Sequence, residues 1–187
     1  MLQTLQINQQ ELKLHTAAGV FSQYGLDQGS LILLREIDLP QPPARVLDMG
    51  CGCGVLGLTV AQLLPQAQVV LMDSDIRAVR LARRNAKLNQ LKNVQVELGD
   101  VTQDLADLSP FDLVLSNPPT HQGKQVLLGF AQAASQSLKS TGEAYFVVNR
   151  LKSLIPKLQN YFHQVDKLAS KSGYLVIRAR QPKIQTA

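Results

Sequence analysis

Short apolar runs alternate with helix-period segments from residue 45 onward. Runs rich in valine, leucine and methionine or phenylalanine lie at residues 46–49, 67–72, 93–98, 111–116 and 143–148. Their length and apolar character predict buried strands. Between several of them, apolar positions recur every three or four residues, over residues 55–64, 75–89 and 122–139. We therefore predict an α/β fold in which helices connect the strands of a parallel sheet.

The C-terminal part of the chain departs from this alternation. A helix is predicted over residues 153–162, and two strand-like runs follow at residues 165–169 and 174–179. Ser172-Gly173 lies between these two runs and is typical of a tight turn. Strands joined by so short a connection run antiparallel, so we expect a hairpin at one edge of the sheet.

The first 43 residues are predicted to form a lead-in segment that packs on a core built from residues 44–187. Its predicted elements are a small hairpin from residues 1–8 and 11–15 and a helix over residues 31–37 capped by Asp27 or Ser30. A proline-rich stretch then separates it from the first core strand. A segment of about 40 residues rarely buries a core of its own, so we expect one domain overall.

A glycine-rich loop follows the first predicted core strand. It reads Asp48-Met49-Gly50-Cys51-Gly52-Cys53-Gly54 and leads into the helix predicted from residue 55. Alternating glycines permit a sharp turn and let backbone N–H groups approach a ligand closely. A strand, such a loop and a helix N-terminus form the cofactor cradle of doubly wound sheets. Residues 52–57 also satisfy the G-x-G-x-x-G pattern, so an NAD(P)-dependent oxidoreductase is an alternative.

Carboxylates at three predicted strand ends favour a cationic cofactor over a dinucleotide. Asp48, Asp73 and Asp100 each come at the end of a strand or just after it, on the ligand-binding side of a parallel sheet. Asp48 would repel a pyrophosphate but attract the ammonium group of S-adenosylmethionine. Asp73 suits ribose hydroxyls, and Asp100 could accept from the adenine amine. We therefore predict S-adenosylmethionine as the cofactor.

A second motif, Ser116-Asn117-Pro118-Pro119, follows the fourth core strand. Two prolines remove two N–H donors and leave carbonyl oxygens and the Asn117 amide oxygen as acceptors. Acceptors on one side of an –NH₂ group would direct its lone pair at a methyl donor, and transfer would then depend on positioning more than on a strong base. We predict that Asn117, Pro118 and Pro119 form the catalytic segment of an enzyme that methylates an exocyclic amine.

Together these motifs resemble the class I S-adenosylmethionine-dependent methyltransferases with an Asn-Pro-Pro motif. Among these, the chain is similar to the catalytic domain of the small-subunit (16S) rRNA guanine-N2 methyltransferases. The likeness covers residues 19–180 and includes Gly19-Val20-Phe21-Ser22, residues 25–30 and the two motifs above. The resemblance implies a Rossmann-like fold with helices on both faces of a seven-stranded mixed sheet, in the order 3-2-1-4-5-7-6 with strand 7 antiparallel.

The resemblance also implies roles for individual residues. Cofactor-binding roles fall on Asp48, Gly50, Cys51, Gly52 and Gly54 at the methionine part, Asp73 and Ser74 at the ribose, Asp100 and Val101 at the adenine, and Asn117. Substrate-binding roles fall on Phe21, Thr120 and His121. The family usually has Phe or Tyr after the two prolines, where this chain has Thr120. Loss of that ring removes about 1–3 kcal/mol of base stacking, which Phe21, His121 or Tyr24 would have to replace.

The charge balance is compatible with an RNA partner. The formal net charge is +5, with a pI near 9.4, and a basic surface attracts a polyanion. The helix predicted over residues 75–89 concentrates cations on one face and apolar side chains on the other. The cations are Arg77, Arg80, Arg84 and Lys87, with Arg83 nearby, and the apolar residues are Ile76, Val79, Ala82 and Ala86. This face is either a phosphate-binding surface in a complex with ribosomal RNA or an ordinary solvated one.

The remaining features narrow the class of protein. The two cysteines are two residues apart in the glycine loop, which suits neither a disulfide nor a zinc site, so we expect no metal. No apolar run has the length of a membrane span, and we expect a cytoplasmic location. Protein glutamine or adenine N6 is an alternative substrate, because either presents a planar –NH₂ group. A non-catalytic RNA-binding protein is a further alternative.

Overall fold

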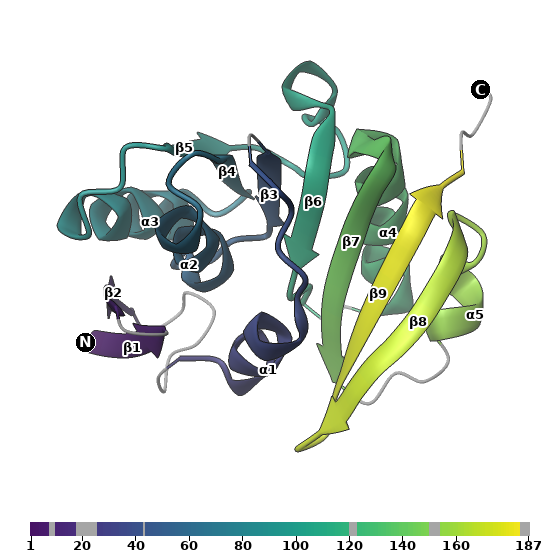
Figure 1. Ribbon diagram of the computed structural model, residues 1–187, viewed down its shortest axis with the longest axis horizontal. Coiled ribbons are helices and arrows are strands. Elements are labelled where there is room, and N and C mark those ends of the chain that lie inside the picture. Colours follow the sequence, from purple (N-terminus) through teal and green to yellow (C-terminus); the bar gives the residue numbers. More distant parts are fainter. Residues whose placement is uncertain (8–9, 18–25, 43, 120–122, 150–153, 184–187) are drawn as a thin grey trace.

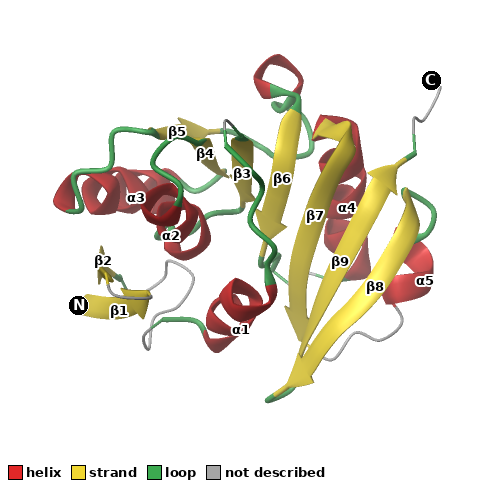
Figure 2. Cartoon of the chain, viewed as in Figure 1, coloured by secondary structure: helices red, strands yellow, loops and turns green. Residues whose placement is uncertain are grey.

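The chain folds around one central sheet with helices on both of its faces (Figures 1 and 2). The structure is a computed structural model, and it describes residues 1–7, 10–17, 26–42, 44–119, 123–149 and 154–183. The sheet has seven strands in the order β5-β4-β3-β6-β7-β9-β8. A separate two-stranded sheet lies at the N-terminal end. Within the described ranges, no helix has both the length and the apolar character that a membrane span needs.

The strand order confirms the expected topology. The strands are β3 (Arg45–Met49), β4 (Gln68–Asp73), β5 (Val94–Leu98), β6 (Phe111–Ser116), β7 (Leu138–Asn149), β8 (Phe162–Lys171) and β9 (Tyr174–Pro182). The five strands from β5 to β7 pair in parallel, whereas β9 is antiparallel to both β7 and β8. Numbered within the sheet, this is the order 3-2-1-4-5-7-6 with strand 7 antiparallel.

Two apolar clusters cover the two faces of the sheet. The helices are α1 (Gln28–Glu36), α2 (Val55–Leu63), α3 (Ile76–Leu88), α4 (Lys124–Ser137) and α5 (Ile155–Leu158), with a 3₁₀ turn, η1, at Ala106–Leu108. Val46 and its cluster pack with α1, α2 and α3. Leu47 and its cluster pack with α4 and α5. Consecutive residues of β3 thus enter opposite clusters, as a strand buried on both faces requires.

The N-terminal hairpin and the first helix confirm the elements predicted there. Strands β1 (Leu2–Ile7) and β2 (Gln10–His15) pair antiparallel, and Leu12 and Leu14 are fully buried in the α1–α3 cluster. Asp27 caps α1, because its side chain accepts a hydrogen bond from the Ser30 N–H at 2.9 Å. The helix therefore begins three residues earlier than the apolar period indicates.

Three details of the helices differ from expectation. Helix α5 is one turn long, because Phe162 belongs to β8, where it is fully buried and paired with Pro182. Helix α4 ends at Ser137, because Leu138 begins β7 opposite Phe111. Ile76 is 40% exposed, so the apolar face of α3 consists of alanines and Val79 without it. For Phe162 and Leu138, strand pairing outweighs local periodicity.

Helix α3 joins the hairpin to the glycine loop through a buried asparagine. The Asn85 side chain accepts from the His15 N–H at 2.7 Å and donates to the His15 carbonyl at 3.0 Å. The same amide nitrogen donates to the Cys53 carbonyl at 2.9 Å. One turn later, Asn89 pairs in the same way with Lys13. The two amides thus continue the hydrogen bonding of β2 at its open edge.

We expect Asn85→Ala to lower the free energy of unfolding by about 2–3 kcal/mol, because it leaves buried backbone groups without partners. Asn89→Ala is the matched comparison, since Asn89 makes the same pairing at a half-buried position. We expect a loss of about 1 kcal/mol there. Urea denaturation followed by circular dichroism measures both. A loss for Asn85→Ala no greater than that for Asn89→Ala would contradict the buried linkage.

Candidate active site

The glycine loop (residues 50–54) uses its N–H groups within the protein. Gly50 and Cys51 donate to the Met72 carbonyl at 2.9 and 3.0 Å, and Gly54 donates to the Cys51 carbonyl at 2.8 Å. Gly52 donates to the Asp73 carboxylate at 2.8 Å. We expected these groups to face a ligand, and for these four residues that expectation is wrong. With four of its five N–H groups occupied, the loop does not offer a pyrophosphate the row of free donors that it needs, so the oxidoreductase alternative loses most of the feature on which it rested.

The loop turns sharply over the end of β3, and the helix after it packs very closely. Gly50, Gly52 and Gly54 have positive φ angles of 69°, 56° and 90°, a region that side chains rarely adopt. On α2, a Cβ added to Gly57 would lie 2.9 Å from the Asp48 Cβ. The glycines therefore let α2 begin directly over the carboxylate at the end of β3.

Asp48 is a buried carboxylate without a cationic partner among the described residues. It is 1% exposed, and its Oδ2 accepts from the Gly57 N–H at 2.8 Å. Burial raises the pKa of the Asp48 carboxyl to about 7, opposed by the Gly57 hydrogen bond and reinforced by the charge of Asp73. No Lys or Arg is among the described residues that line the pocket at this carboxylate. The site therefore suits a cation and disfavours an anion.

Asp73 lies at the neighbouring strand end and supports the loop. Its Oδ2 accepts from Gly52, and its Oδ1 accepts from the Asp75 N–H at 2.9 Å. Each carboxylate oxygen can accept more than one hydrogen bond, so Asp73 keeps acceptor capacity for ligand hydroxyls. The two hydrogen bonds hold its side chain in place for that role.

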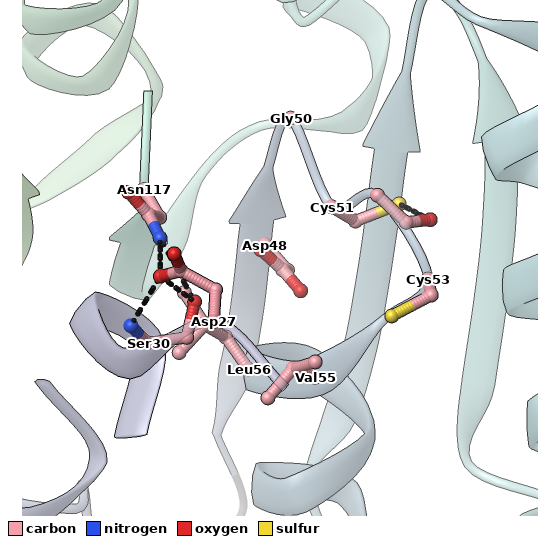
Figure 3. A pocket seen from close by; sticks show the side chains of 10 residues that line it. Asp27, Ser30, Asp48, Gly50, Cys51, Cys53, Val55, Leu56 and Asn117 are labelled. Carbon is pink, nitrogen blue, oxygen red and sulfur yellow. Dashed lines mark hydrogen bonds between the residues drawn. The ribbon is translucent and has the colours of Figure 1, made fainter. Parts of the chain in front are cut away.

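Asn117 is placed by the end of β6. The preceding residue, Ser116, is fully buried and donates from its hydroxyl to the Met49 carbonyl at 2.9 Å, which ties the carboxyl ends of β6 and β3 together. The Asn117 amide nitrogen donates to Oδ1 of Asp27, the N-cap of α1, and to Oγ of Ser30 in the first turn of α1 (Figure 3). Within the described part of the chain, no donor contacts the Asn117 amide oxygen or the Pro118 carbonyl.

A pocket joins the ends of β3 and β6 with the first turns of α1 and α2. Figure 3 shows Asp48 between the loop cysteines on one side and Asp27, Ser30 and Asn117 on the other. The lining residues are Asp27, Ser30, Asp48, Gly50, Cys51, Gly52, Cys53, Val55, Leu56 and Asn117. Both cysteines are free thiols, and burial raises the pKa of Cys51 and raises that of Cys53 to about 11, so neither is a reactive thiolate at neutral pH.

The pocket gathers five of the predicted site residues: Asp48, Gly50, Cys51, Gly52 and Asn117. The other predicted residues have different surroundings. Ser74 is exposed and Val101 is buried. The Asp100 carboxylate accepts from Thr102 and Gln103 within its own turn, and these hydrogen bonds lower its pKa. Phe21, Thr120 and His121 lie outside the described residues.

Sequence patterns missed two polar residues of the pocket as parts of the site. Asp27 and Ser30 were expected only to cap α1, yet both contact Asn117. The signal available for them was their place in residues 25–30, which carry part of the family resemblance. A helix-capping role already accounts for Asp27 and Ser30, and the sequence pattern gives no sign of their contact with Asn117.

Comparison with known proteins places this site in a family. A model of the family described as methyltransferase small domain matches residues 11–178. The chain belongs to the methyltransferase small domain family. This membership, with the observed sheet order, confirms the class I methyltransferase fold and the methyltransferase assignment made from the motifs.

Individual relatives are similar to this chain over most of its length. The Bacillus subtilis protein YbxB is 32% identical over 88% of this chain and 83% of its own length. Ribosomal RNA small subunit methyltransferase C of Stutzerimonas stutzeri is 34% identical over 94% of this chain and 53% of its own length. A solved T. thermophilus 16S rRNA N2 methyltransferase (RsmC), in complex with AdoMet and guanosine, superimposes with a TM-score of 0.85 at 29% identity. That match covers 97% of this chain and 50% of RsmC, so the chain spans about half the length of the methyltransferase C relatives.

Proposed function

We propose that this methyltransferase small domain protein acts in the cytoplasm, where it transfers a methyl group from S-adenosylmethionine to the exocyclic N2 of a guanine in small-subunit rRNA. The observation that carries the proposal is the placement of Asn117, with an unoccupied amide oxygen, in the same pocket as the buried Asp48 carboxylate. The substrates named for RsmC and for the methyltransferase C relatives support the choice of rRNA.

The carboxylates of the site fit the cofactor. S-adenosylmethionine, when bound, supplies an electrophilic methyl group on a sulfonium and carries a cationic ammonium group. Asp48 would hold that ammonium group, since it is buried and lacks a cationic partner among the described residues. Asp73 would accept from the ribose hydroxyls with the acceptor capacity that its two internal hydrogen bonds leave free.

The Asn-Pro-Pro segment offers two hydrogen-bond acceptors to the target amine. The Asn117 amide oxygen and the Pro118 carbonyl can each accept one hydrogen from an –NH₂ group. Both hydrogens would then be held on the protein side, and the nitrogen lone pair would point away from them. Because this lone pair is delocalised in a free guanine, orientation of the amine is the main contribution of the site.

A polyanionic substrate also fits the outer face of α3. The helix carries five cations and no carboxylate. Arg77 pairs with Asp75, and Arg83 donates to the Val96 carbonyl, whereas Arg80, Arg84 and Lys87 are exposed. Exposed arginines one turn apart can contact successive phosphates of an RNA strand.

We expect the double variant Arg80→Glu/Arg84→Glu to weaken binding to ribosomal RNA by at least tenfold and to flatten the dependence of log affinity on log salt by about 2. Filter binding over a range of salt concentrations measures both quantities. The matched control is Lys167→Glu/Lys171→Glu on β8, which makes the same change of charge at exposed positions. Equal losses for the two variants would show that only net charge matters and that α3 is an ordinary solvated face.

The proposed function is tested with labelled S-adenosylmethionine, offered separately with small ribosomal subunits and with deproteinised rRNA. Nucleosides from a complete digest are separated and counted. We expect label in N2-methylguanosine. Label in N6-methyladenosine or in protein glutamine would keep the chemistry but overturn the substrate. Binding of S-adenosylhomocysteine without any transfer would overturn the enzyme in favour of a non-catalytic RNA-binding protein.

A further inference from the structure

Helix α1 holds both hydrogens of the Asn117 side-chain amide. The amide nitrogen lies 2.5 Å from Asp27 Oδ1 and 2.9 Å from Ser30 Oγ. An ionised carboxylate can only accept hydrogen bonds, so it selects the nitrogen end of the amide. The oxygen end must then face the opposite way, where an incoming amine would need an acceptor.

Further hydrogen bonds fix the positions of Asp27 and Ser30, the two residues that bind the Asn117 amide. Asp27 Oδ1 also accepts from the Ser30 N–H at 2.9 Å and from the Ser30 hydroxyl at 3.3 Å, which locks it at the helix N-terminus. The Tyr174 hydroxyl of β9 lies 3.5 Å from Asp27 Oδ2. A Cβ on Gly29 would lie 2.7 Å from the Tyr174 ring, so α1 and β9 are in close contact at this point. The first turn of α1 therefore has little freedom to move away from Asn117.

We propose that Asp27 and Ser30 are positioning residues for methyl transfer and act through Asn117. Without them, the amide could rotate and present its –NH₂ group to the target –NH₂ group, which would place donor against donor. With them, the amide oxygen is preset as an acceptor before substrate arrives. The carboxylate also polarises the amide, which makes that oxygen a stronger acceptor. This proposal rests on the proposed function, since it concerns how the site holds an amine.

The position of α1 explains how the N-terminal lead-in segment contributes a residue, Asp27, to the site. Asp27 and Asn117 are 90 residues apart in sequence, and only the packing of α1 over the ends of β6 and β9 brings them together. The Asp27 carboxylate lies at the nitrogen end of the Asn117 amide, and its charge increases the negative partial charge on the amide oxygen, which would face the amine nitrogen as that nitrogen becomes positive. Such preset charge lowers the energy of the transition state relative to the ground state.

The test uses Asp27→Ser and Ser30→Ala in the full chain. Serine caps a helix as well as aspartate does, but its side chain is shorter and uncharged. We expect kcat to fall by about 10- to 100-fold for Asp27→Ser and by less for Ser30→Ala. KM for S-adenosylmethionine and the thermal midpoint should stay close to wild type. Asp27→Asn, which keeps the cap and one acceptor oxygen, should recover part of kcat. Gln28→Ala, exposed in the same helical turn, is the matched control.

A double-variant cycle decides whether Asp27 acts through Asn117. If it does, adding Asp27→Ser to Asn117→Ala causes no further loss of kcat. An independent readout is the side-chain amide resonance of Asn117, assigned by its absence in Asn117→Ala. Its downfield proton should move toward the free-amide position in Asp27→Ser.

Three outcomes would overturn the proposal: an unchanged kcat for Asp27→Ser, additive losses in the cycle, or an unchanged amide resonance. The failure of the proposed function would look different, because wild-type protein would then place no label in N2-methylguanosine. If Asp27→Ser loses activity only in proportion to its loss of folded protein, Asp27→Asn decides the question, because asparagine keeps the helix cap. A wild-type amide resonance and a wild-type kcat in Asp27→Asn, in spite of the lost charge, would then overturn the proposal as well.

Discussion

Asn117→Ala is expected to slow methyl transfer by about 100- to 1,000-fold, which is the usual cost of removing one preset hydrogen-bonding group from an active site. The amide oxygen is the acceptor that orients the target amine, and alanine offers nothing in its place. Because the loss concerns orientation, kcat should fall much more than the affinity for cofactor. Single-turnover transfer of labelled methyl and calorimetric titration with S-adenosylhomocysteine separate the two quantities.

The control for this variant is Asn160→Ala, which removes the same side chain at an exposed turn. It should transfer methyl groups at the wild-type rate. Near wild-type transfer by Asn117→Ala would show that the amine is held by other groups, and the role proposed for the Asn-Pro-Pro segment would then be abandoned.

Asp48→Asn is expected to weaken S-adenosylmethionine binding by about 100-fold at pH 8, because it removes the buried charge that faces the ammonium group. Asparagine has nearly the same shape and can still accept from the Gly57 N–H, so the fold should be kept. In the absence of cofactor, the variant should be at least as stable as wild type at this pH. Wild type must hold a buried carboxylate ionised there, whereas asparagine is neutral.

The pH dependence follows from the raised pKa of Asp48. With a pKa of about 7 in the folded protein and 3.8 as the reference, the native state binds the proton more tightly than the unfolded state. The contribution of the Asp48 carboxyl to the free energy of unfolding therefore falls as pH rises from about 4 to about 7. Cofactor binding has the opposite dependence, since only the ionised form attracts a cation. Wild-type affinity should be about tenfold weaker at pH 6 than at pH 8.

Calorimetry of S-adenosylhomocysteine binding across this pH range checks the prediction, with Asp48→Asn as the reference that lacks the titrating group. Wild type should release a proton on binding at pH 6, which appears as a dependence of the measured enthalpy on the buffer. An affinity for wild type that is flat between pH 6 and pH 8, or a variant with the same slope as wild type, would contradict the assigned role of Asp48.

Local patterns in the sequence are enough to predict most of the fold. Each core strand is a short apolar run, and these runs alternate with longer segments of helical period, so the elements can be located one at a time. Parallel strands end at one edge of their sheet, and this rule by itself puts Asp48, Asp73 and Asn117 on the same side. The strand order follows from the family resemblance and not from periodicity, because periodicity does not say which strands are neighbours.

The limits of local patterns appear where tertiary contacts compete with them. The apolar period predicts a helix that ends at Phe162. In the structure Phe162 is buried in β8 instead, so α5 is one turn long. The glycine loop has the composition of a phosphate-binding loop, yet its donors pair with Met72 and Asp73. Composition alone does not reveal such pairing, because the partners lie on the next strand.

The sequence by itself thus determined the α/β class, the two motifs and the kind of chemistry they serve, because these depend on residue types at short spacing. Only the tertiary structure decided that Asp27 and Ser30 contact Asn117 and that Asn85 links the hairpin to the glycine loop. These contacts join residues 90, 87 and 32 positions apart. They depend on how helices pack over the strand ends, and no short-range period of the chain records that packing.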